Sequence, residues 1–181
     1  PHLSINTKLC TAQSYLLSKG TYNCSTWPPL PTPASAKFHK CIFDLYRAIT
    51  NNYFIPGVGK VLMSDADIIE EYGFLSPVGL IRLARVSLLA RIFCKNSEYL
   101  IGIICTMARY CSVGWLSLVE HDFFLMSIQS PCDIFSNKSL LQCIQIVASD
   151  PKYWLRECRK TLKLPFMNQI TNAVIKSPAI S

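Results

Sequence analysis

Near the C-terminal end of the chain, the spacing of several basic side chains suits binding to a polyanion. Lys152, Arg156, Arg159 and Lys163 are separated by four, three and four residues, and Lys160 lies beside them. In an α-helix this spacing places the side chains on one face. Such a row can contact successive phosphates of a nucleic acid and release its counterions. We therefore predict a nucleic-acid-binding site at Lys152, Arg156, Arg159, Lys160 and Lys163; the alternative is the solvated outer face of a terminal helix.

The distribution of charge supports this choice of segment. The chain of 181 residues has a net charge of +7. Residues 1–150 hold twelve Lys and Arg against ten Asp and Glu, whereas residues 151–181 hold six against one. Tyr153 and Trp154 add aromatic groups beside the basic row, and Lys37, Lys40 and Arg47 are weaker candidates for the same role. The basic character thus belongs mainly to the C-terminal segment.

Three other groups of residues resemble catalytic or metal sites but have simpler interpretations. Asp65 and Asp67 are paired carboxylates, yet they follow Ser64, and acidic residues are favoured at the start of a helix. The adjacent pair His121-Asp122 is used on a metal by some phosphohydrolases, but such a site needs further ligands, and the other histidines are His2 and His39. Residues 57–60, GVGK, are too short for a phosphate-binding loop.

The cysteines favour a reducing compartment. There are nine, an odd number, and no Cys-x-x-Cys pair occurs. Tetrahedral zinc sites draw their ligands from such close pairs. We expect reduced thiols that pack as small apolar groups, no metal or cofactor, and an intracellular location in the nucleus or cytoplasm. A small thiol or metal enzyme is the least favoured function.

Apolar periodicity and helix-start signals predict an all-α fold of seven or eight helices. Ser35, Ser64, Ser139 and Asp150 look like N-caps, and Pro77 and Pro151 look like first helical residues. The expected helices span residues 7–19, 37–51, 65–72, 77–95, 98–110, 112–126, 139–149 and 151–164. A short strand is possible near residues 15–27. No membrane span is expected, because Arg82, Arg85 and Arg91 interrupt the most apolar stretch, residues 74–93.

The composition divides the chain into three segments. Residues 1–34 end in a connector rich in Trp and Pro, in which residues 28–33, PPLPTP, predict a stiff polyproline-like spacer and Trp27 an anchor on the packed helices. Residues 35–130 form a helical linker domain, and residues 131–181 form a basic helical segment.

Several short patterns lie in a fixed order between residues 7 and 125. They are TKL at 7–9, YLL at 15–17, YNCSTW at 22–27, FDLYRAI at 43–49 and WLSLVEHD at 115–122. Ser64-Asp65, Gly73, Pro77 and residues 83–91, LARVSLLAR, lie between them. This order resembles the thumb and downstream helical linker of reverse transcriptases from non-LTR retrotransposons of protist, dinoflagellate-like type.

The resemblance implies contact with an RNA/DNA template–primer duplex and a catalytic palm domain upstream in a parent chain. That parent would be an RNA-directed DNA polymerase. This chain departs from the family in three ways: Asn23-Cys24-Ser25 replaces the Gly-x-Glu pattern, and both the metal-binding Tyr-x-Asp-Asp and the Cys/His knuckle are absent. We therefore expect a non-catalytic fragment, inactive alone. The alternative function is a helical protein–protein interaction module that uses Trp115, Phe123 and Phe124.

Overall fold

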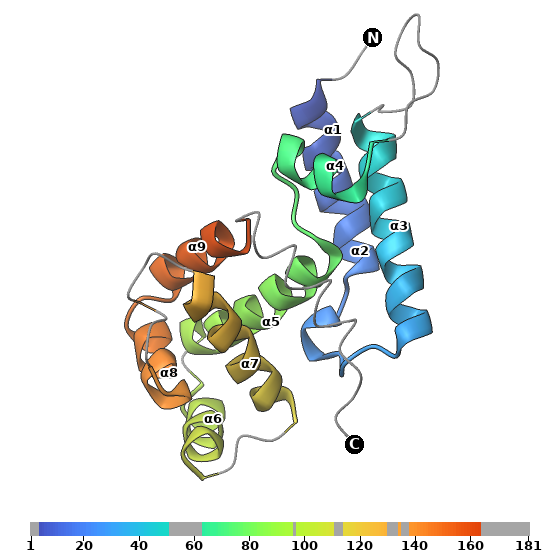
Figure 1. Ribbon diagram of the computed structural model, residues 1–181. Coiled ribbons are helices and arrows are strands. Elements are labelled where there is room, and N and C mark those ends of the chain that lie inside the picture. The colour runs from blue at the N-terminus through green and yellow to red at the C-terminus, as the bar shows by residue number, and fades with distance from the viewer. Residues whose placement is uncertain are drawn as a thin grey trace, which may run out of the picture. The chain divides into compact units, whose positions relative to one another are not determined.

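The computed structural model describes residues 4–50, 63–95, 97–110, 114–129, 134 and 138–163 (Figure 1). These residues form helices and no strand, so the predicted all-α class is confirmed. Within them, seven helices have eight or more residues, from α3 to α9. The possible strand near residues 15–27 is wrong: this stretch contains the end of a π-helical turn, a short α-helix and a 3-10 turn.

The chain forms two compact units, which are described separately. Unit 1 comprises residues 1–23 and 29–77, and unit 2 comprises residues 24–28 and 78–181. The three segments inferred from composition, 1–34, 35–130 and 131–181, have different bounds and remain a prediction.

Unit 1 contains a helical N-terminal segment and two further helices. The first segment runs through α1 (Ile5–Thr11), a π-helical stretch (Ala12–Leu17) and α2 (Ser18–Gly20). Helix α3 (Thr32–Thr50) contacts α1 and α4 (Asp65–Tyr72), as Figure 1 shows. Within this unit, the buried side chains of α3 include Ile42 and Ile49.

The start of α3 differs from the prediction. Ser35 does not cap the helix: its backbone N–H already donates to the Pro31 carbonyl at 2.9 Å, within the first turn. Pro33 lies in that turn, where the missing N–H of proline removes no helical hydrogen bond. The helix therefore takes in the last two residues of the predicted spacer, Thr32 and Pro33.

Helix α4 begins and ends as its sequence predicts. The Ser64 hydroxyl accepts the Asp67 N–H at 3.2 Å, and the Asp67 carboxylate accepts the Ser64 N–H at 3.3 Å. This reciprocal pair is a capping box, which satisfies two N–H groups that the helix leaves free. Gly73 ends α4 in the left-handed conformation, with a φ of 61°.

Tyr46 joins α3 to the segment after α4. Its side chain is only 2% exposed, and its ring centroid lies 4.4 Å from that of Phe74. The hydroxyl donates to the Leu75 carbonyl at 2.8 Å. Burial raises the pKa of this phenol well above its usual value, which keeps the donated proton in place.

Unit 2 is built from α5 (Pro77–Cys94), α6 (Glu98–Tyr110), α7 (Trp115–Gln129), α8 (Leu140–Ser149) and α9 (Pro151–Leu162). Helix α7 contacts α6, α8 and α9 (Figure 1), and α8 also contacts α6 and α9. The buried side chains of α7 include Leu116, Val119 and Met126. The segment 24–28 joins this unit through Trp115, whose indole N–H donates to the Ser25 carbonyl at 2.5 Å.

No single helix in the described ranges is both long enough and apolar enough to cross a membrane. The pairs α4 with α5 and α6 with α7 reach the necessary length and composition only as pairs interrupted by a bend.

The Tyr46 hydrogen bond generates a stability prediction. Tyr46→Phe should lower the free energy of unfolding by about 1 kcal/mol, because the Leu75 carbonyl, which is partly buried, loses its donor. Urea denaturation followed by circular dichroism measures the change. Tyr22→Phe is the matched control, because Tyr22 is 73% exposed in the same unit, and it should leave the midpoint unchanged. Equal midpoints for the two variants would contradict a role for this bond.

Candidate nucleic-acid interface

Helix α9 carries the five basic residues predicted to bind nucleic acid. Asp150 caps it, accepting the Tyr153 N–H at 2.9 Å, and Pro151 is its first residue, as predicted. The inner face buries Trp154, Cys158, Thr161 and Leu162. The Trp154 ring packs edge-on against Phe123 of α7, with centroids 5.2 Å apart. This apolar contact fixes which side of α9 faces outward.

All five basic side chains are exposed, four of them on α9 and the fifth, Lys163, at the residue that caps its C-terminal end. They are Lys152, Arg156, Arg159, Lys160 and Lys163. Tyr153 is also exposed, and the Arg156 guanidinium lies 5.1 Å from the centre of its ring. Trp154, in contrast, is completely buried, so the expectation that it adds aromatic surface is wrong.

One carboxylate interrupts this basic face. Glu157 accepts hydrogen bonds from Lys160 at 2.8 Å and from Arg156 at 3.4 Å. The hydrogen bond from Lys160 is the main cause of a lowered pKa for Glu157. Lys152, Arg159 and Lys163 have no ion pair or side-chain hydrogen bond within the described part of the chain. Three cations therefore remain available to an external anion.

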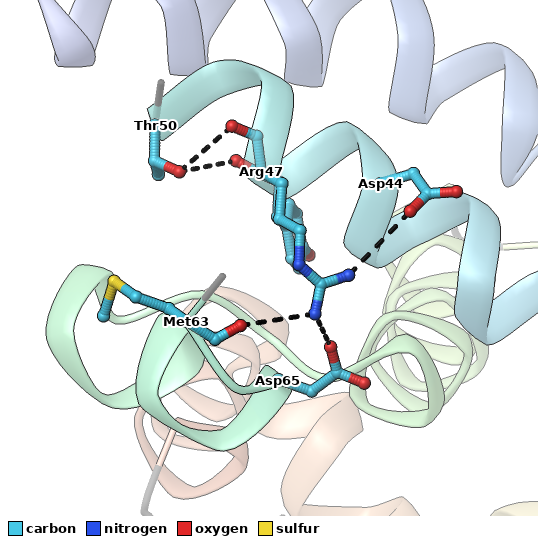
Figure 2. Close-up of polar contacts among 6 residues, drawn as sticks. Asp44, Arg47, Thr50, Met63 and Asp65 are labelled. Carbon is cyan, nitrogen blue, oxygen red and sulfur yellow. Dashed lines mark hydrogen bonds and ion pairs between the residues drawn. The ribbon is translucent and has the colours of Figure 1, made fainter. Parts of the chain in front are cut away.

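The weaker basic candidates lie in unit 1, and they differ in whether an external anion could reach them. Figure 2 shows that the Arg47 guanidinium is turned toward Asp65, at the first residue of α4, and toward the Met63 carbonyl. A second ion pair joins Arg47 to Asp44 at 3.8 Å. Arg47 thus connects α3 to α4, whereas Lys37 and Lys40 are exposed on α3.

The paired carboxylates Asp65 and Asp67 have separate structural roles. Asp65 pairs with Arg47, and Asp67 completes the capping box with Ser64. Across the described ranges, no group of three or more His, Cys, Asp or Glu side chains could hold a metal ion. The loop at residues 57–60 lies outside the described residues.

The structure places Asp122 in a buried ion cluster with two arginines of α5. Its carboxylate is 1% exposed and lies 3.2 Å from Arg82 Nε and 2.7 Å from Arg85 Nη1. Burial raises the pKa of Asp122 to about 6, and both arginines oppose the rise. The two guanidinium groups in contact with the carboxylate favour its ionised form.

Arginines on a mostly apolar helix either extend their charged ends to water or pair with acidic residues. The sequence did not identify Asp122 as the partner of Arg82 and Arg85. An available signal was the position of Asp122 directly before the apolar run Phe123-Phe124-Leu125-Met126. The neighbouring His121 lies on the exposed side of α7, and partial burial together with the two arginines lowers its pKa.

The cysteines divide between core and surface. Cys24, Cys143 and Cys158 are buried, as expected for thiols that pack as small apolar groups, and burial raises the pKa of Cys143 to about 11. Cys10, Cys41 and Cys94 are exposed, so the expectation of core packing is wrong for them. Cys111 and Cys132 lie outside the described residues.

A pocket of about 450 Å³ opens between α7 and the start of α8. Its lining mixes apolar and polar side chains and contains none of the five basic residues of α9. The lining residues are Glu120, Phe123, Phe124, Ser127, Lys138, Ser139, Leu140 and Cys143.

No family model, curated protein or solved structure matches this chain. The resemblance to retroelement reverse transcriptases therefore remains a prediction from the sequence patterns.

The buried ion cluster leads to a second stability prediction. Asp122→Asn should lower the free energy of unfolding by about 3 kcal/mol, because it leaves two largely buried guanidinium groups without their counter-ion. Chemical denaturation measures the loss. Glu120→Gln makes the matched change on an exposed side chain of the same helix and should shift stability by less than about 0.5 kcal/mol. An Asp122→Asn protein as stable as Glu120→Gln would show that the cluster contributes no net stability.

Proposed function

We propose that this chain is a non-catalytic helical module that contacts nucleic-acid phosphates through α9. In the setting suggested by the sequence resemblance, the ligand is the RNA/DNA template–primer duplex of a retroelement reverse transcriptase, whose catalytic palm belongs to the upstream part of a parent chain. The observation that carries the proposal is the exposed row of five basic residues on a helix whose opposite face is buried and mainly apolar.

The dimensions of the row fit a duplex backbone. Lys152 and Lys163 are eleven residues apart, which corresponds to about 16 Å along a helix. A duplex presents one phosphate charge per about 1.7 Å of its axis. Counted along one strand, at about 3.4 Å of axis per phosphate, a row of this length lies beside roughly five phosphates, one for each basic side chain.

The charge balance of the face also favours an anionic ligand. Glu157 offsets part of the charge of Lys160 and Arg156, while Lys152, Arg159 and Lys163 have no partner in the described residues. These cations would exchange water and counterions for phosphate oxygens. Lys and Arg without base-reading geometry bind the backbone, so we expect affinity that depends strongly on salt and weakly on base sequence.

The second candidate function is a protein–protein interaction module. The surface first expected for it does not form as a unit: Phe123 is buried against Trp154, and Trp115 is half-buried beside Ser25, leaving Phe124 exposed. An exposed apolar face on α6 supports this function instead.

The test of nucleic-acid binding is a salt series with a fluorescent RNA–DNA hybrid. A variant with Lys152, Arg156, Arg159 and Lys163 changed to Gln should bind more weakly, and its plot of log affinity against log salt should flatten by roughly three to four units. Fluorescence anisotropy from low to moderate salt measures both quantities. Helix content by circular dichroism verifies folding.

A charge-matched control separates the α9 row from net charge. Changing Lys8, Lys19, Arg91 and Lys95 to Gln also removes four positive charges, at positions distant in sequence from α9. This variant should retain most of the salt slope. Similar losses in both variants would attribute binding to overall charge, and no binding by the folded wild-type chain at low salt would overturn the proposal.

A further inference from the structure

Helix α6 has an exposed face with several large apolar side chains. Tyr99 is 80% exposed, Tyr110 75%, Leu100 46% and Ile103 41%. Single exposed apolar residues are ordinary, but a concentration of them on one helix marks an interaction surface. Tyrosine is also among the residues enriched in protein interfaces.

The exposed residues of α6 form a continuous seam. Tyr99, Ile103, Thr106 and Tyr110 are separated by four, three and four residues, which is the spacing of a helix–helix contact. The other side of α6 buries Ile104, and α6 contacts α7 and α8 within unit 2 (Figure 1). The packing within the unit thus uses one face and leaves the seam uncovered.

The centre of the seam permits close approach of another helix. Gly102 is exposed, and a Cβ atom added there would meet no atom within 4 Å. The hydroxyl of Thr106 donates to the Gly102 carbonyl at 2.8 Å, within the helix itself. Thr106 can therefore be covered without leaving its hydroxyl unpaired.

Two opposite charges lie on the same edge of this face, at the two ends of α6. Glu98 is in the first turn and Arg109 in the last, and both are exposed. Neither has an ion pair or side-chain hydrogen bond among the described residues. They are eleven residues apart, about three turns of helix, which returns them to nearly the same angular position.

We propose that the α6 seam is the interface of a homodimer in which two copies of α6 pack antiparallel about a twofold axis. This axis is perpendicular to both helices, so the second copy runs in the opposite direction. The edge that carries Glu98 and Arg109 lies on the same side of the dimer in both copies. Glu98 of each copy then lies beside Arg109 of the other, giving two equivalent ion pairs. In a parallel pair the charged edges of the two copies would lie on opposite sides of the seam, and neither ion pair could form, so charge complementarity favours a second copy in the antiparallel arrangement.

The first test is sedimentation velocity of the full chain between about 1 and about 200 µM, since a single-helix seam gives a small and hence weak interface. The wild type should change from monomer to dimer over this range. Ile103→Glu places a charge in the centre of the seam and should keep the protein monomeric. Ile128→Glu is the matched control, because Ile128 is 53% exposed on α7 outside the seam, and it should dimerise as the wild type does.

A charge-reversal series tests the direction of packing. Glu98→Arg and Arg109→Glu should each weaken dimerisation by roughly five-fold or more, because each replaces two attractive pairs by two repulsive ones. The double variant should restore wild-type dimerisation, since it only exchanges the partners within each pair. Helix content by circular dichroism is expected to be the same for all variants.

The outcomes are decisive in both directions. Dimerisation that Ile103→Glu abolishes and the double charge variant restores establishes the antiparallel seam. A wild-type chain that stays monomeric across the range overturns the proposal and indicates that the seam serves another partner or another segment of the chain. A dimer that survives Ile103→Glu overturns it as well, because its interface lies elsewhere.

Discussion

The buried carboxylate of Asp122 constrains the structure of unit 2 more than any other interaction described. An ion removed from water is tolerated only when counter-ions and hydrogen bonds surround it. Asp122 meets this condition with Arg82 and Arg85, one turn apart on α5, so α5 and α7 must hold one register. The next residue on α7, Phe123, packs against Trp154. The register of α7 therefore helps to determine which face of α9 is buried and which presents its basic residues.

Local signals in the sequence predicted most of the helix boundaries. The caps at Ser64, Ser139 and Asp150, and the left-handed Gly73, act over a few residues and are readable from residue type. The predicted N-cap at Ser35 was wrong because a helix can begin earlier when proline occupies its first turn. Residues 15–27 were ambiguous because aromatic and hydroxyl residues with strand preference occur there, and tertiary packing overrides such preferences. Spacing also placed the five residues of α9 on one side of the helix.

What the sequence could not supply were contacts between distant residues. The partner of Arg85 lies 37 positions away, and the carbonyl that accepts the Trp115 indole N–H lies 90 positions away. Trp154 follows Tyr153 directly, yet one is buried and the other exposed, because the angular step of a helix turns neighbours to different sides. Exposure of Phe124 beside a buried Phe123 has the same origin.

The two proposed surfaces are exposed for different physical reasons, one electrostatic and one hydrophobic. Several acidic side chains are committed within the fold: Asp65 and Asp122 to arginines, and Asp67 and Asp150 to helix N-termini. That commitment leaves the cations of α9 poorly neutralised, and a polyanion would complete their coordination. Helix α6 instead carries more apolar area than its neighbours cover, and a similar apolar surface from another copy would exclude water from it.

If both interactions form, dimerisation presents two basic faces on one particle. A nucleic acid long enough to reach both would bind the second at a raised effective concentration, so its affinity would increase with protein association even though each α9 face makes the same contacts.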